Sequence, residues 1–202
     1  MTTADKVRTK VRRAPVGTFI RPASLPGSRP AVLTALSRLH ADGELVRIRN
    51  GLYWKGVRSR FGPGRPGLLD AALAAGGGKG AGPAGWSATQ VLGLSTQVPA
   101  IPEVAVAGPV RTLEGVRFHR RSNVERRDLN FYEVALIEAL RDFPRYSELD
   151  IEAIARRVRS LEEEGKVHLA RVTRVASSEH SSALRQNLET VRTLLDDTPA
   201  AA

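Results

Sequence analysis

A capped helix followed closely by a tight hairpin signal constrains the first third of this chain more than any other feature. Ser28 is a suitable N-cap residue, Pro30 lies in the first turn and Gly43 ends the segment, so a helix is predicted between Ser28 and Gly43. Its apolar stripe at helical spacing is formed by Val32, Leu33, Leu36 and Leu39. Asn50-Gly51 then joins the runs 45–49 and 52–55, and this pair is typical of a two-residue hairpin turn.

The segments before this helix complete a recognisable order of elements. Residues 2–13 are predicted to form a basic helix that ends before Pro15 and Gly17. An apolar stretch at Phe19 and Ile20 follows, with room for one helical turn after Pro22. A helix, a short helix, a longer capped helix and a basic hairpin, in this order, predict a winged helix-turn-helix domain over residues 1–60.

The net charge of the chain belongs entirely to this predicted domain. The sequence has 31 Lys and Arg residues against 21 Asp and Glu residues, a formal net charge of +10. Residues 1–60 hold thirteen of the basic residues and three acids, Asp5, Asp42 and Glu44, whereas residues 61–202 are balanced. Because Lys and Arg displace counterions from phosphate, the asymmetry indicates a double-stranded DNA partner, with a merely solvated basic surface as the alternative.

The winged-helix prediction assigns DNA-contacting roles by position. The outward side chains of the third helix are expected to face base edges, and its first turn, through free amide groups, a phosphate. The helix candidates are Ser28, Arg29, Thr34, Ser37 and Arg38; the hairpin candidates are Arg47, Arg49, Asn50 and Lys55; and the first-helix candidates for backbone contact are Arg8, Arg12 and Arg13. For each residue alone, a solvated surface position is the alternative.

Pairing outward from the Asn50-Gly51 turn predicts the register of the hairpin. It places Arg49 opposite Leu52, with the pairs Ile48–Tyr53, Arg47–Trp54 and Val46–Lys55 following in turn. Since alternate residues share a face, Val46, Ile48 and Tyr53 are expected in the core. Arg47 and Arg49 are then expected beside Trp54 on the other face.

The remaining residues predict a second domain of mixed α/β structure. Two prolines and three glycines in residues 60–67 mark a boundary, giving a linker at 61–67, a domain at 68–197 and a disordered tail at 198–202. Helices are predicted at 68–75, 87–92 (capped by Ser87), 131–140, 148–164 and 178–195, and strands at 103–107 and 116–120 around a Gly108-Pro109 turn. The fold class is therefore α+β.

No catalytic, metal or cofactor site is predicted. The chain has no cysteine and four scattered histidines, so thiolate chemistry and a Cys-based zinc site are excluded. Glu148 and Asp150 form an acid-x-acid pair, but their position suits the start of a helix. The Gly-rich segment 76–85 lacks phosphate-loop spacing, and the serines at 177–182 lack an oriented acid. Without an apolar run long enough for a membrane helix or a signal core, a soluble cytoplasmic protein is expected.

Three stretches of the sequence carry a family resemblance. Gly27-Ser28-Arg29 leading into AVLTALSRLHADGELVRIRNGLYW, followed by GWSATQVLGLSTQVPAIPEVAV and VRFHRRS, resembles the AbiEi-type antitoxins of toxin–antitoxin operons over nearly the whole chain. The second stretch, with Trp86-Ser87-Ala88 and Gly93-Leu94, is the more specific. The resemblance implies a winged-helix DNA-binding domain and a C-terminal antitoxin domain. It further implies that the protein neutralises a nucleotidyltransferase-fold toxin and represses its own operon.

Alternatives to an antitoxin remain open from the sequence alone. One is a winged-helix transcriptional regulator whose C-terminal domain senses a ligand or dimerises, without a toxin partner. An enzyme is disfavoured because no catalytic constellation is found. No residue motif identifies the toxin contacts; helical faces in 131–145 and 184–195 mix apolar and charged residues, and internal packing is the favoured interpretation of both.

Overall fold

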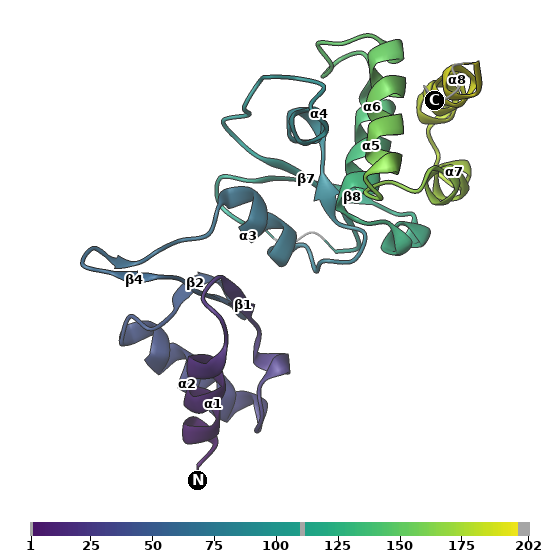
Figure 1. The fold of residues 1–202 in the computed structure, drawn as a ribbon. Coiled ribbons are helices and arrows are strands. Elements are labelled where there is room, and N and C mark those ends of the chain that lie inside the picture. Colours follow the sequence, from purple (N-terminus) through teal and green to yellow (C-terminus); the bar gives the residue numbers. More distant parts are fainter. Residues whose placement is uncertain (1, 110–111, 198–202) are drawn as a thin grey trace. The chain divides into compact units, whose positions relative to one another are not determined.

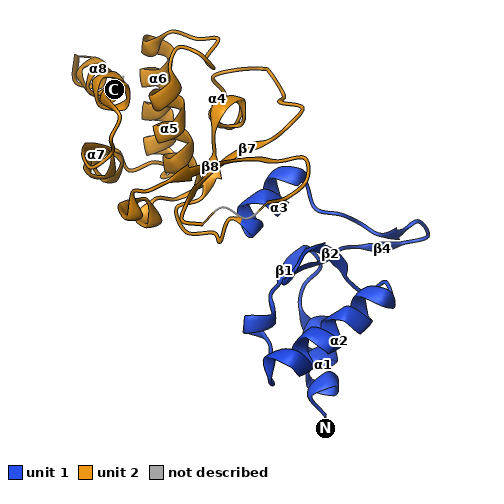
Figure 2. Cartoon of the chain, turned by 180° about the vertical axis from the view of Figure 1, so that it is seen from behind, with its two compact units in different colours: residues 1–75 blue, residues 76–202 orange. Residues whose placement is uncertain are grey.

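The computed structural model describes residues 2–109 and 112–197, and these have a mixed α+β structure (Figure 1). The chain divides into two compact units, residues 1–75 and 76–202 (Figure 2). The predicted linker at 61–67 lies inside the first unit, and the predicted tail at 198–202 lies outside the described residues. None of the helices described has the length and apolar character needed to cross a lipid bilayer.

The first unit begins with four helical or extended elements. They are α1 (Thr3–Arg13), β1 (Thr18–Ile20), the 3-10 turn η1 (Pro22–Ser24) and α2 (Arg29–Ala41). The hairpin strands β2 (Val46–Arg49) and β3 (Leu52–Lys55) follow, and the antiparallel sheet has the order β1-β3-β2. The core consists of Val7, Val11, Ile20, Val32, Ala35, Leu36, Leu39, Leu45 and Tyr53. Removal of this apolar surface from water holds the two helices on the sheet.

The predicted hairpin register is wrong beyond its first pair. Arg49 does oppose Leu52, but an irregularity between Arg47 and Arg49 shifts the ladder, so that Arg47 opposes Tyr53 and Val46 opposes Trp54. Such a bulge adds one residue to one strand. Trp54 packs instead on Phe19 of β1, with ring centroids 4.6 Å apart. Of the predicted helix stripe, Leu33 is 37% exposed, and Ala35 takes its place in the core.

A second, smaller hairpin occupies the segment expected to lack strands. β4 (Arg58–Ser59) pairs with β5 (Gly62–Pro63), and Gly62 at φ +101° supplies a backbone conformation that other residues rarely adopt. α3 (Leu68–Ala75) follows. Its last carbonyl groups accept hydrogen bonds from the guanidinium groups of Arg21 and Arg49, the latter at 3.3 Å. These bonds tie α3 to the first unit.

The second unit is built on a three-stranded sheet of order β6-β7-β8. β6 (Gly82–Pro83) runs antiparallel to β7 (Glu103–Ala107), and β8 (Arg117–Arg121) runs parallel to β7. The two long strands therefore do not form a hairpin around Gly108-Pro109. α4 (Gly85–Leu92) starts at the N-cap Ala84 and not at Ser87, whose hydroxyl accepts a hydrogen bond from the Glu103 amide at 3.0 Å.

Helices complete the second unit around a large apolar core. After the 3-10 segment η2 (Val124–Asp128) come α5 (Phe131–Asp142), α6 (Ile151–Glu163), α7 (Leu169–Ser177) and α8 (Ser182–Asp197). The sequence prediction missed α7, and it began the last helix at residue 178, four residues before the start of α8. α4 and α8 pack against α5, in which every residue from Glu133 to Leu140 is buried. The predicted candidate face on α5 is thus internal, as are Leu184, Leu188 and Val191 of α8.

Candidate nucleic-acid interface

The exposed face of α2 carries three of the predicted base-contacting residues. Thr34, Ser37 and Arg38 are all exposed, because the opposite face is fixed in the core by Val32 and Leu36. The Thr34 hydroxyl donates to the Pro30 carbonyl at 3.1 Å. Ser37 and Arg38 form no side-chain hydrogen bond or ion pair with the described residues. Their polar groups face solvent.

The first turn of α2 has no side-chain cap, so its amide groups could bind an anion. Ser28 is the N-cap residue, but its side chain makes no capping hydrogen bond, and Arg29 beside it is exposed. The first amide groups of a helix lack partners within the helix, and they favour a negatively charged group. Gly27 precedes them at φ +121°, and a Cβ there would lie 2.3 Å from Cγ2 of Thr3. A glycine is therefore needed where α1 and α2 approach each other.

The hairpin residues differ in how free their side chains are. Arg47 and Asn50 are exposed. Arg49 is half-buried and donates to the carbonyl groups of Asn50 at 3.2 Å and Ala75 at 3.3 Å. The Lys55 ammonium donates to the carbonyl groups of three residues at the end of α1, at 2.6–3.0 Å. Lys55 thus holds α1 to β3, a structural role that its charge alone did not reveal.

On α1, one predicted contact residue is paired and two are not. Arg8 and Arg13 are exposed and form no ion pair with the described residues. Arg12 forms a two-pronged ion pair with Glu44, with N–O distances of 3.2 and 2.9 Å. The hydrogen bond from Arg12 lowers the pKa of the Glu44 carboxyl below its usual value. Arg12 is thereby oriented toward the loop that follows α2.

The two units of the chain differ in how many of their arginines form ion pairs. Among the described residues 2–60, with Arg49 left aside, Arg12–Glu44 is the one ion pair between side chains. In the second unit, by contrast, most arginines pair with carboxylates; these are Arg117, Arg121, Arg126, Arg141, Arg157, Arg171, Arg174 and Arg192. The exposed arginines without a partner in the described structure, such as Arg8, Arg13, Arg38 and Arg47, are therefore available to an external anion.

The β4–β5 hairpin adds basic residues that the sequence analysis assigned to no site. Its turn presents Phe61, which is 85% exposed, and the Arg60 guanidinium lies 4.6 Å from the centre of that ring. Arg58 is exposed in the same ribbon, and Ser59 fixes the turn by accepting from the Phe61 amide and donating to the Gly62 carbonyl. The signal that could have found this hairpin is the alternation of arginines around an apolar residue in RSRFG.

The acid pair Glu148 and Asp150 has structural partners, and the described residues show no cluster of candidate metal ligands. They contain no group of three or more His, Asp or Glu side chains that could hold a metal ion. The acid pair is used structurally: Asp150 caps α6 through the Ala153 amide at 2.7 Å, and Glu148 accepts from the Thr96 amide at 2.8 Å. The hydrogen bond from the Thr96 amide lowers the pKa of the Glu148 carboxyl, and a hydrogen bond with the Gln97 side chain lowers it further.

Comparisons with known proteins leave the family open. No protein-family model and no curated protein matches the chain. Among solved structures, a crystal structure of the RV2827C protein from Mycobacterium tuberculosis is similar at 17% sequence identity and a TM-score of 0.45. The match covers 100% of this chain and 83% of that one. A TM-score of this size does not establish a shared fold.

Proposed function

We propose that residues 1–60 form a winged helix-turn-helix that binds double-stranded DNA in the promoter of the protein's own operon. The observation that carries the proposal is the set of exposed cations in these residues that have no carboxylate partner. The element order α1-β1-η1-α2-β2-β3 and the sheet order β1-β3-β2 support the winged-helix assignment. In this arrangement α2 is the recognition helix and the β2–β3 hairpin is the wing.

Three kinds of contact follow from the geometry of the first unit. Thr34, Ser37 and Arg38 face base edges in the major groove, and Arg38 is suited to a bidentate contact with guanine. Arg8 and Arg13 meet phosphate groups, as does the open first turn of α2. The β4–β5 hairpin supplies a further contact: Arg58 and Arg60 bind the DNA backbone while Phe61 contacts a base step in the minor groove.

A pair of matched arginine variants tests the recognition role of α2. Arg38→Gln is expected to cost about 1–3 kcal/mol on the promoter and to reduce the preference for the promoter over random duplex. Arg156→Gln removes the same charge from an exposed position of α6 and serves as the control. Fluorescence anisotropy at several salt concentrations measures both. Equal affinities of the two variants for the promoter would contradict the assignment of α2.

The salt dependence of binding tests the backbone contacts separately. Arg8→Gln or Arg13→Gln is expected to weaken promoter and random DNA alike, and to reduce the slope of log affinity against log salt by about one. Phe61→Ala should weaken binding without changing that slope, since it removes no charge. An unchanged affinity of the Phe61 variant would remove the hairpin from the interface and leave the rest of the proposal in place.

We further propose that the second unit is an antitoxin domain that neutralises a nucleotidyltransferase-fold toxin. Its support is the resemblance of the GWSATQVLGLSTQVP stretch to AbiEi-type antitoxins. The most distinctive residues of that stretch serve the fold: Trp86 packs edge-on against Tyr146, and Ala88, Leu92 and Leu94 are buried. They therefore mark the kind of domain and are not themselves toxin contacts.

Co-expression with the adjacent toxin gene tests this part. Growth is expected to be restored by the wild-type chain and also by Arg38→Gln, because the recognition helix is not needed for neutralisation. The same variant should release repression of a reporter fused to the promoter. Growth arrest that persists while the protein is soluble and abundant would contradict the antitoxin role. A neighbouring gene of another class would favour a transcriptional regulator without a toxin.

A further inference from the structure

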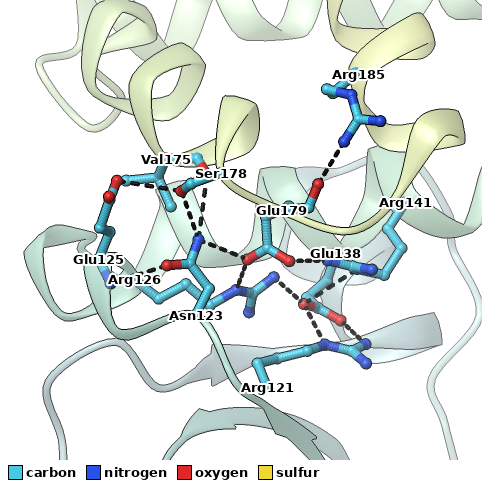
Figure 3. A network of polar contacts seen from close by, with 10 residues as sticks. All are labelled: Arg121, Asn123, Glu125, Arg126, Glu138, Arg141, Val175, Ser178, Glu179 and Arg185. Atoms are coloured by element: carbon cyan, nitrogen blue, oxygen red, sulfur yellow. Dashed lines mark hydrogen bonds and ion pairs between the residues drawn. The ribbon is translucent and has the colours of Figure 1, made fainter.

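Two carboxylates in the second unit are surrounded by three guanidinium groups (Figure 3). Arg126 is fully buried in η2, and it donates through Nε to Glu179 and through Nη2 to Glu138, the latter at 2.5 Å. Arg121 of β8 forms a two-pronged pair with Glu138, with 3.0 Å from Nε to Oε1. Arg141 of α5 donates to the other oxygen of Glu179. The strand β8, the helical segments η2 and α5 and the loop between α7 and α8 thus meet in a single ionic network.

The network has more donors than its acceptors can satisfy. Each guanidinium has five N–H groups, whereas each carboxylate accepts about four hydrogen bonds. Nη1 of Arg126 and Nε of Arg141 are buried, and neither has a hydrogen-bond partner among the described atoms. Three buried or half-buried cations against two anions also leave an uncompensated positive charge, which is costly away from water.

Asp142, a further acid of α5, forms no ion pair with the arginines of the network among the described residues. Asp142 is half-buried at the end of α5. Burial raises the pKa of its carboxyl, and the neighbouring Glu138 raises it further. Of the two residues with an unpartnered donor in the described part of the chain, Arg141 lines the adjacent pocket, whereas Arg126 does not.

A pocket of about 380 Å³ opens beside this network. Its lining is polar and contains a single acid: Arg120, Arg121, Ser122, Asn123, Arg141, Ser178, Glu179 and His180. Arg120 is exposed and forms no hydrogen bond or ion pair with the described residues. The volume lies within the range of small-molecule sites, roughly 300–1,000 Å³.

We propose that this pocket binds the phosphate group of a small ligand, with Arg120 and Arg141 as its charged contacts. Guanidinium groups bind phosphate through paired hydrogen bonds, and the hydroxyl and imidazole groups at the rim add further donors. The room left beside the phosphate accommodates an organic part such as a nucleoside. Free phosphate and a nucleoside monophosphate share this chemistry, and titration with each distinguishes them.

Calorimetric titration of the full chain tests the site. Inorganic phosphate and AMP are titrated separately at constant ionic strength, with acetate as the carboxylate comparison. Saturable binding of phosphate or AMP, and none of acetate, is expected. Arg120→Gln should weaken that binding about tenfold, the effect of one charge-assisted hydrogen bond. Because Arg120 has no internal partner, this variant is expected to fold as the wild type does.

Two arginine variants separate the pocket from general charge effects. Arg127→Gln changes an exposed arginine of η2 outside the pocket lining, and Arg38→Gln changes one in the first unit. Both should leave phosphate binding unchanged, and Arg120→Gln should leave DNA binding unchanged. Failure of the DNA proposal would therefore not affect this result. Absence of saturable binding up to about 10 mM, or an equal loss in the Arg127 variant, would overturn the proposal.

Discussion

Replacement of Lys55 by methionine is expected to destabilise the first unit while leaving DNA binding intact. The Lys55 ammonium donates to the carbonyl groups of Val11 at 3.0 Å, Arg12 at 2.7 Å and Ala14 at 2.6 Å. These groups lie at the C-terminal end of α1, where carbonyl oxygens attract positive charge, although the Val11 carbonyl also accepts from the Ala14 amide at 3.2 Å. Lys55→Met removes the ammonium but keeps most of the apolar stem.

The size of the stability loss in Lys55→Met is estimated from its three hydrogen bonds and from its position at the C-terminal end of α1. A hydrogen bond to a charged group contributes about 1.5–3 kcal/mol when the partner stays buried, but water can replace part of it at a half-exposed position. We therefore assign about 0.5 kcal/mol to each of the three bonds. The favourable charge at the helix C-terminus adds about 0.5 kcal/mol. The expected loss in the free energy of unfolding is about 2 kcal/mol.

Urea unfolding followed by tryptophan fluorescence measures this loss. Trp54 reports on the first unit because it packs on Phe19, and a Trp86→Phe background removes the signal of the second unit. Arg47→Met is the matched control, since Arg47 is exposed in the same sheet and forms no side-chain bond with the described residues. A surface change of this kind is expected to alter stability by less than about 0.5 kcal/mol.

Two results would refute the reasoning about Lys55. One is a loss of stability in Lys55→Met that does not exceed the loss in Arg47→Met. The other is a tenfold or larger loss of promoter affinity in the folded Lys55 variant. That second result would restore the role in DNA contact that the sequence predicted for this lysine. A stability loss with unchanged affinity would support the structural role.

The remaining predictions concern the second unit. Gly93→Ala is expected to cost about 1 kcal/mol in urea unfolding, because Gly93 ends α4 at φ +73° and the nearest obstacle to a Cβ, Nε of Arg157, is 3.8 Å away. Arg126→Met should cost about 3–5 kcal/mol, because it removes the buried guanidinium that donates hydrogen bonds to both Glu138 and Glu179. Burial alone would raise the pKa of Glu138, but Arg121 and Arg126 hold it below the usual value. The contribution of this carboxylate to the free energy of unfolding is thus complete above about pH 4.5 and is lost as pH falls through the lower pKa of the folded state. Glu138→Gln should therefore make the free energy of unfolding less dependent on pH across that range.

Elements governed by local signals could be predicted from the sequence. The helix expected between Ser28 and Gly43 is observed at Arg29–Ala41, and the predicted strand 52–55 is observed with the same bounds. Caps, a turn pair and helical periodicity are all contained within a few residues. The hairpin register could not be predicted in this way, because Trp54 finds its partner on β1, and β1 lies more than thirty residues earlier in the chain.

The exposure of the candidate site residues could be predicted, but their partners could not. Helical spacing alone places Thr34, Ser37 and Arg38 away from the core, as the structure has them. Lys55 acquires its acceptors from residues 41–44 positions away, and Arg126 acquires Glu179 from 53 positions away. Only the tertiary fold brings such groups together. A charged residue therefore has the same appearance in the sequence whether it is solvated, bridges two elements or is buried in a network.

Residues 61–202 have no net charge, and the structure shows that part of their charge is buried in ion pairs. A neutral segment could have carried its charges at the surface, where ion pairs contribute little. Instead Arg126, Glu138 and Glu179 are buried together, so these charges serve the fold of the second unit. Arginine substitutions should consequently act on different quantities in the two units. In the first unit, changes such as Arg38→Gln should alter binding and leave the free energy of unfolding nearly unchanged. In the second unit, substitution of a buried, paired arginine such as Arg126 should lower the free energy of unfolding, whereas substitution of Arg120, which lines the pocket without a partner among the described residues, should alter binding.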